Sequence, residues 1–140
     1  VGACLARGKT ASILQPGNHG STYGGNPVAC AAVSAVLNTL KEQQLCQQVQ
    51  TSGDYFYQQL HIALADNPNV HTIRHKGLMI GIELHHECTE LVQQAIDHGL
   101  LINVTAGKVI RLLPPLIMSK NDIDQVIHIL TSLIPTSTSG

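Results

Sequence analysis

The most informative stretch of this sequence occupies residues 17–27 and reads GNHGSTYGGNP. It holds two adjacent hydroxyl side chains, Ser21 and Thr22, among glycines that leave backbone N–H groups accessible. Asn26 is a favourable helix N-cap, and Pro27 suits the first helical position because its missing N–H would be unpaired there anyway. Hydroxyls, free N–H groups and a helix N-terminus are the components of an anion site, and phosphate is the usual anion. The same residues also suit an ordinary capped loop before a helix, so the pattern alone leaves both interpretations open.

The segments around this stretch differ in composition. Residues 1–6, VGACLA, are typical of a buried strand, and residues 7–25 form a loop long enough to suggest a functional role. Residues 27–40 are apolar nearly all round, which predicts a helix buried on most sides. Residues 41–65 repeat apolar side chains at spacings of four and seven, as in an amphipathic surface helix. Gly53 is a candidate for a bend or break in that helix.

The rest of the chain predicts a sheet with helices packed on it. Apolar and polar side chains alternate in residues 78–84, as in a half-buried strand. Further strands are expected at residues 70–74, 100–104 and 109–113, a short helix at 88–98 that ends at Gly99, and a last helix that begins with a capping box at Ser119 and Asp122. The order of helix, two strands, helix, two strands and helix indicates an α+β domain.

Composition excludes several classes of function. The 140 residues are 44% hydrophobic but only 12% charged, with a net charge of −1, so the chain is neither disordered nor suited to nucleic acid. No apolar run is long enough to span a membrane. The four cysteines lack a C-x-x-C spacing and are expected to be reduced thiols of a cytoplasmic protein. So little charge suggests a surface covered by something else, and a first residue Val1 suggests a fragment.

Four blocks resemble, in order, class III pyridoxal-phosphate-dependent aminotransferases. Residues 17–30, GNHGSTYGGNPVAC, look like the family segment G-x-H-G-[ST]-T-[FY]-G-G-N-P, and residues 77–83, GLMIGIE, look like its strand G-x-M-x-G-[IV]-E. Residues 99–105 with 109–116, GLLINVT and VIRLLPPL, are similar to a block of acetylornithine and ornithine aminotransferases. Residues 1–6 resemble the strand that follows the family's Schiff-base lysine. The likeness covers almost the whole chain.

The resemblance implies a domain organisation. Residues 1–25 would be a remnant of the large cofactor-binding domain, comprising a strand and a phosphate-contact loop, and residues 26–40 a linking helix. Residues 41–134 would be the C-terminal small domain of a fold-type-I transferase, with an antiparallel sheet, and residues 135–140 a tail.

The resemblance also assigns residues to the site. Family members are homodimers with pyridoxal phosphate at the subunit interface, where a Ser-Thr pair reaches the phosphate of the neighbour's cofactor. These positions match Ser21 and Thr22, with Thr22 as the main contact. The family's arginine, which binds a substrate carboxylate or pairs with a glutamate elsewhere, falls on Arg111.

Arg111 also stands out without the family. It lies between Val109-Ile110 and Leu112-Leu113, and a guanidinium among such neighbours requires a carboxylate because a buried unpaired charge is costly. The alternative is an edge-strand arginine that extends into water. Both interpretations are compatible with the residues alone.

Other reactive side chains are weaker candidates. His85, His86, Glu87 and Cys88 could suggest a metal, but neighbours on a strand point to opposite faces, so a polar strand end is favoured and no metal is expected. His19 is equally suited to a cofactor contact and to a loop hydrogen bond.

The lysines of the chain are not expected to be catalytic. Lys108 is expected to be solvated, with nothing nearby to lower its pKa, and Lys9 and Lys76 are similar. None stands at the family's Schiff-base position, which would lie before Val1.

The function implied by the resemblance is transfer of the δ-amino group of N-acetylornithine to 2-oxoglutarate in arginine biosynthesis. This chain alone is expected to be inactive, because the lysine and the carboxylate on the pyridine nitrogen come from upstream. An ornithine or other ω-amino-acid aminotransferase is the alternative. A non-catalytic packing or dimerisation domain is an alternative of another class.

Overall fold

The computed structural model describes residues 2–134 and residue 136, and these divide into two compact units. The first unit ends at Gln44 and the second begins at Leu45. Val1 and most of the tail expected at residues 135–140 lie outside the described residues. No described helix combines the length and apolar character needed to cross a membrane.

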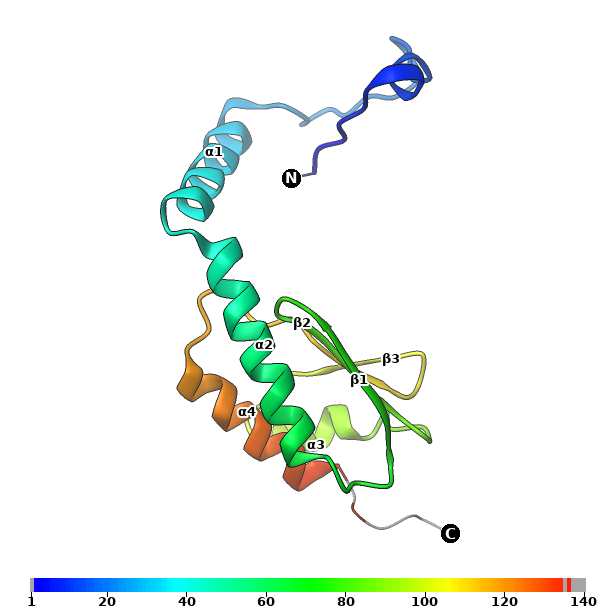
Figure 1. The fold of residues 1–140 in the computed structure, drawn as a ribbon. Coiled ribbons are helices and arrows are strands. Elements are labelled where there is room, and N and C mark those ends of the chain that lie inside the picture. Colours follow the sequence, from blue (N-terminus) through cyan, green and yellow to red (C-terminus); the bar gives the residue numbers. More distant parts are fainter. Residues whose placement is uncertain (1, 135, 137–140) are drawn as a thin grey trace. The chain divides into compact units, whose positions relative to one another are not determined.

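The first unit holds a 3-10 helix, η1 (Gly8–Ser12), and one α-helix, α1 (Pro27–Glu42), joined by the long loop (Figure 1). The expectation of a buried strand at residues 1–6 is wrong for residues 2–6, which are exposed and without regular structure. A strand needs a neighbouring strand to pair its backbone groups, and the described residues 2–44 contain none.

Helix α1 begins where the sequence predicts. The Asn26 side chain accepts a hydrogen bond from the Ala29 N–H at 3.0 Å, and Pro27 occupies the first helical position. The predicted burial is wrong, because α1 contains no buried residue and Val28, Val36 and Leu37 are well over half exposed. Besides α1, the described residues 2–44 contain only the short helix η1 and no strand. No element of this unit therefore covers the apolar surface of α1, which is exposed.

The second unit confirms the predicted α+β class and the antiparallel sheet. Strands β1 (Val70–Lys76), β2 (Met79–Leu84), β3 (Asn103–Thr105) and β4 (Val109–Leu112) form a four-stranded sheet of order β1-β2-β4-β3, with every neighbouring pair antiparallel. Helices α2 (Leu45–Ala63), α3 (Leu91–Asp97) and α4 (Lys120–Leu133) cover one face of this sheet (Figure 1).

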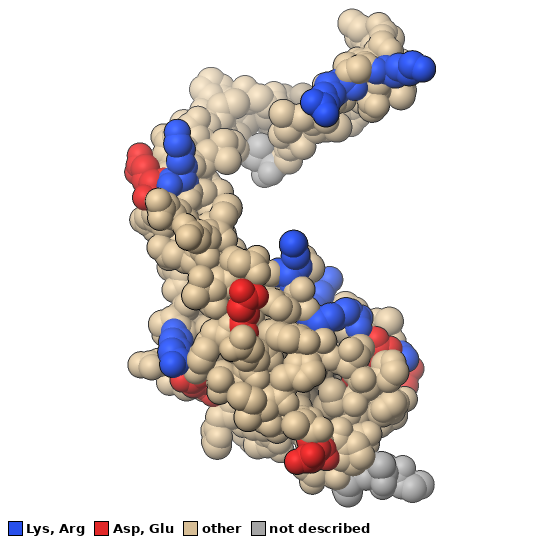
Figure 2. Space-filling view, in the orientation of Figure 1, with Lys and Arg blue, Asp and Glu red and all other residues tan. Residues whose placement is uncertain are grey.

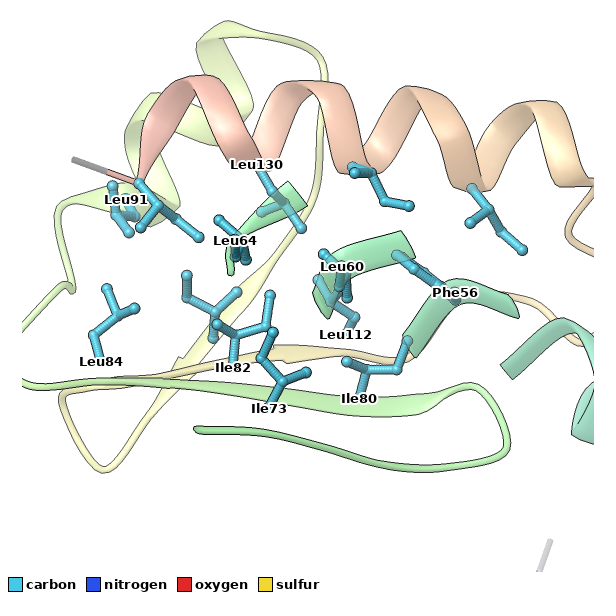
Figure 3. Packing of buried hydrophobic residues seen from close by; sticks show 14 of the residues in the cluster. Phe56, Leu60, Leu64, Ile73, Ile80, Ile82, Leu84, Leu91, Leu112 and Leu130 are labelled. Carbon is cyan, nitrogen blue, oxygen red and sulfur yellow. The ribbon is translucent and has the colours of Figure 1, made fainter. Parts of the chain in front are cut away.

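The core of the second unit lies between the sheet and these three helices (Figure 3). Alternate residues of the strands point into it, because side chains of a strand alternate between faces. The fully buried side chains include Phe56 and Leu60 of α2, Ile80 and Ile82 of β2, Ile110 of β4, and Ile123 and Leu130 of α4. The opposite face, here called the outer face, has no covering helix among the described residues of the second unit.

Local sequence signals explain most element boundaries. The predicted capping box of α4 is confirmed, with Ser119 and Asp122 each bonded to the other's backbone N–H. Gly99 ends α3 with a φ of 75°, as predicted. Helix α3 and strand β3 are shorter than predicted. Helix α3 begins at Leu91 where residue 88 was expected, and β3 begins at Asn103 where residue 100 was expected.

Gly53 does not break its helix, because α2 continues through it. The helix instead packs closely beneath the β1–β2 turn, where a Cβ on Gly53 would overlap the backbone of Gly77. The glycine is therefore required by the close approach of two backbones.

Candidate functional site

The loop before α1 is held by Asn26. Its side-chain amide donates to the Tyr23 carbonyl at 2.7 Å while its oxygen caps the helix. The Gly24 N–H donates to the Ser21 carbonyl at 3.4 Å, and a Cβ at Gly24 would come within 2.9 Å of the Ser21 Cβ. A tight turn thus sets Ser21 and Thr22 just before the N-terminus of the helix.

Both hydroxyl side chains of this turn are exposed, and within the described part of the chain neither makes a hydrogen bond. Two free O–H donors beside a helix N-terminus fit the oxygens of a phosphate group. His19, also exposed, shares the loop. The loop therefore presents hydrogen-bond donors of the kind that suit a phosphate group.

Arg111 lies on the outer face of the sheet. In the register of the strands it faces Gly81 of β2, and Gly81 in turn faces Arg74 of β1. Because Gly81 has no side chain, the surface is hollowed between the two arginines. This hollow has a volume of about 300 Å³, and it is lined by Arg74, Lys76, Met79, Gly81, Thr105 and Arg111 among others.

Arg111 is not buried among its apolar neighbours, although one interpretation of the sequence expected it to be. Its apolar neighbours Ile110 and Leu112 point into the core, whereas Arg111 itself is exposed, so burial does not force it to pair. Among the described residues no carboxylate approaches its guanidinium within ion-pair distance. It is therefore free to bind a carboxylate with two parallel N–H groups.

Glu83 and Arg74 lie on this face near Arg111, and the sequence analysis singled out neither of them. The Oε2 of Glu83 accepts from Arg74 Nη1 at 2.9 Å, and its Oε1 lies 2.9 Å from Lys108 Nζ. Hydrogen bonds from Lys108 and then Arg74 lower the pKa of Glu83 from about 4.5 to about 2. Alternation along β1 and β2 places Arg74 and Glu83 on one face, and this signal could have found them.

Cationic side chains dominate the outer face. Figure 2 shows Lys and Arg atoms gathered over the region where Figure 1 draws the sheet. Lys108 was expected to be solvated, and its side chain is 46% exposed, yet it is engaged by Glu83. Lys76 lines the same hollow, whereas Lys9 lies in η1 of the first unit.

The residues suspected of metal binding do not converge. The ring of His85 contacts that of His71 edge-on at 5.0 Å between centroids, and Cys88 is buried in the core. Glu87 lies over the Gly107 turn, where an added Cβ would meet its carboxylate. Within residues 2–134 and 136, no three His, Cys, Asp or Glu side chains come together as a metal site.

The predicted site residues therefore fall into two groups. Ser21 and Thr22 belong to the first unit, and Arg111 belongs to the second. The groups that suit an anion are hydroxyls in the first unit and a guanidinium in the second.

Comparison with known proteins identifies the family of this chain. Residues 1–134 match the family model for class-III aminotransferases. Acetylornithine aminotransferase 1 of Bordetella pertussis is 45% identical over 96% of the chain, and ornithine aminotransferase 1 of Staphylococcus saprophyticus is 39% identical over the same share. In both cases the chain spans 34% of the relative's length.

A solved structure shares the fold. The ornithine aminotransferase of Toxoplasma gondii, described with partial occupancy of PLP at its active site, superposes with a TM-score of 0.81 at 29% identity. The superposition covers 93% of this chain and 32% of that one. The family match over nearly all residues and the shared fold lead to one conclusion, that this chain belongs to the class-III aminotransferases, a pyridoxal-phosphate-dependent family.

Proposed function

We propose that this chain is part of an aminotransferase that moves the δ-amino group of N-acetylornithine to 2-oxoglutarate, in arginine biosynthesis. The observation that carries the proposal is Arg111, a guanidinium with no partner among the described residues, at the rim of a hollow on the outer face. N-acetylornithine, glutamate and 2-oxoglutarate all carry an α-carboxylate that this group can bind. Relatives named acetylornithine aminotransferase support the choice of amino donor.

The role of Arg111 in this proposal is to hold and orient the substrate. Its planar fork donates two parallel N–H bonds to one carboxylate, which fixes the direction of the molecule as well as its position. Orientation of this kind lowers the entropic part of the barrier. Backbone rigidity is provided by β4, whose Arg111 is paired on both sides, with Gly81 of β2 and Asn103 of β3.

Ser21 and Thr22 have a different role in the proposal, which is to donate hydrogen bonds to the phosphate of pyridoxal phosphate. When bound, this cofactor supplies the electron sink that amino-group transfer requires. By the family resemblance, the phosphate belongs to the cofactor of the second copy in a cytoplasmic homodimer. Residues 1–25 would then belong to the large domain and residues 26–40 would link it to the small one.

Residues 1–140 would supply only part of the active site. The lysine that carries the cofactor and the carboxylate that holds the pyridine nitrogen would come from other parts of the full-length protein. The 140-residue chain by itself is then inactive. Ornithine is the second candidate for the amino donor, because several relatives are named ornithine aminotransferases.

The amino donor is tested directly in the full-length protein loaded with pyridoxal phosphate. We expect turnover of 2-oxoglutarate to glutamate to be faster with N-acetylornithine than with ornithine, and absent when residues 1–140 replace the full-length protein. Initial rates with each donor at equal concentrations measure this. Faster turnover of ornithine would reassign the donor, and turnover by residues 1–140 alone would contradict the division of the site.

The cofactor contact is tested by Thr22→Val in the full-length protein. Valine keeps the shape of threonine and removes the O–H donor, so cofactor affinity should fall about ten-fold, since a hydrogen bond to a charged group contributes about 1.5–3 kcal/mol and Ser21 remains. Titration of the apoprotein with pyridoxal phosphate measures this, and Ser21→Ala should have the smaller effect. Unchanged affinity in both variants would show that the turn is only structural.

A further inference from the structure

Glu83 is a carboxylate on the outer face that can compete with a substrate carboxylate for the Arg111 guanidinium. It is the only acidic residue in the four strands, and it faces Val109 of β4, two residues from Arg111 on the same side of the sheet. Diagonal neighbours of this kind lie within reach of long side chains. An unoccupied Glu83 oxygen would therefore compete with a substrate carboxylate for the same guanidinium.

Both oxygens of Glu83 are already occupied. Arg74 takes Oε2 and Lys108 takes Oε1, each at 2.9 Å, and the Glu83 side chain is only 19% exposed. Arg74 reaches its oxygen by running across Gly81, where the nearest Arg74 atoms would lie 3.7 Å from an added Cβ. This is an ordinary van der Waals distance, so the Arg74 side chain lies alongside Gly81 on its way to Glu83.

Lys108 is fixed beside Glu83 by its backbone. The Lys108 carbonyl accepts from the Leu84 N–H at 2.9 Å, and the Gly107 carbonyl accepts from the Cys88 N–H at 2.9 Å. The turn that carries Lys108 also has two residues of positive φ, Ala106 at 51° and Gly107 at 71°. A turn anchored at two points fixes the backbone from which the Lys108 side chain reaches Glu83.

From this arrangement we propose that Lys108, together with Arg74, is a positioning residue that occupies Glu83 and so leaves Arg111 free for the substrate carboxylate. The inference rests on the proposed role of Arg111 as the carboxylate-binding residue. The lowered pKa of Glu83 has the same physical cause, the hydrogen bonds from Lys108 and Arg74 that stabilise its ionised form.

The expected effect follows from the share of molecules in which Arg111 is free. If Lys108 is lost, Glu83 pairs with Arg111 in part of the molecules. The apparent substrate affinity is then the intrinsic affinity multiplied by the fraction of molecules in which Arg111 is unpaired. An exposed ion pair between Glu83 and Arg111, at the upper end of the strength usual for such pairs, lowers the apparent substrate affinity about five-fold. Chemistry after binding is not affected, so KM should rise while kcat stays within about two-fold of its original value.

The experiment compares variants of the full-length holoenzyme with 2-oxoglutarate as the varied substrate. Lys108→Met should raise KM about five-fold at nearly constant kcat. Adding Glu83→Gln to that variant should return KM to the original value, and Lys108→Arg, which keeps the pair, should leave it unchanged. Lys120→Met, which removes an equal charge from a lysine stacked on Tyr55 at 4.5 Å, is the matched control and should leave KM unchanged.

Each result decides between accounts. A raised KM that Glu83→Gln does not reverse would overturn the inference, because Lys108 would then contact substrate itself. An unchanged KM in Lys108→Met would overturn it as well. Arg111→Met separates these failures from failure of the proposed function: if it raises KM while Lys108→Met does not, only the role of Lys108 is wrong, and if neither variant changes KM, the role of Arg111 is wrong too.

Discussion

Arg111→Lys in the full-length enzyme should lower kcat/KM for 2-oxoglutarate by roughly ten- to a hundred-fold, although the positive charge is kept. Lysine is a point charge and cannot donate two parallel N–H bonds to one carboxylate. The loss should be largest in the half-reaction of glutamate and 2-oxoglutarate, because the family resemblance implies two arginines for a dicarboxylate. Single-turnover rates of each half-reaction, measured beside the melting temperature, test this.

A structural role for Arg111 gives the opposite pattern. Its side chain is exposed and has no ion pair with any described residue, so it contributes little to the stability of the sheet. We therefore expect the melting temperature of Arg111→Lys to stay near that of the original protein. A lowered melting temperature with both half-reactions intact would remove Arg111 from the site.

The second large effect is on stability, at Gly53. In an exposed helix, glycine to alanine stabilises by about 1 kcal/mol, because alanine has the higher helix propensity. Here we expect Gly53→Ala to destabilise by about 3 kcal/mol, because the new Cβ would overlap the Gly77 backbone and force α2 away from the β1–β2 turn. Helix propensity alone predicts a more stable variant and the backbone contact predicts a less stable one, so the sign of the stability change tests the contact.

Urea unfolding of the 140-residue chain measures the change in the free energy of unfolding at Gly53. Thr51→Ala, at an exposed position on the same helix, is the control and should change that free energy little. A stabilised Gly53→Ala variant would show that α2 and the turn are not in backbone contact.

The second unit was predicted well because its signals are local. Alternation identified β2, the Ser119-Asp122 pair identified the start of α4, and Gly99 identified the end of α3. Each of these patterns acts through neighbours a few residues away. Burial of Ile80 and Ile82 then followed from the period of the strand.

The first unit was predicted less well because its apolar pattern does not identify what packs against it. The apolar residues of α1 indicated burial, and the pattern of residues 1–6 indicated a strand. Among the described residues α1 has no buried residue, and residues 2–6 form no strand. Apolar patterning states that a surface suits burial, and it does not state what covers that surface.

The candidate site shows the same division. Ser21, Thr22 and Arg111 are candidates from sequence because they stand within recognisable blocks, and their roles stay predictions. The contacts of Glu83 with Arg74 and Lys108 were not found, because they join residues from β1, β2 and the β3–β4 turn. Strand register decides which of these side chains meet, and composition does not reveal register.

The most direct test of the central claim is a crystal structure of the full-length enzyme with 2-oxoglutarate bound. We predict that one carboxylate of the ligand accepts hydrogen bonds from two guanidinium nitrogens of Arg111, at about 2.8 Å each, on the outer face beside Gly81. Glu83 should remain paired with Lys108 and Arg74 in that structure. A ligand held by other residues, with Arg111 paired to a protein carboxylate or extended into solvent, would contradict the account.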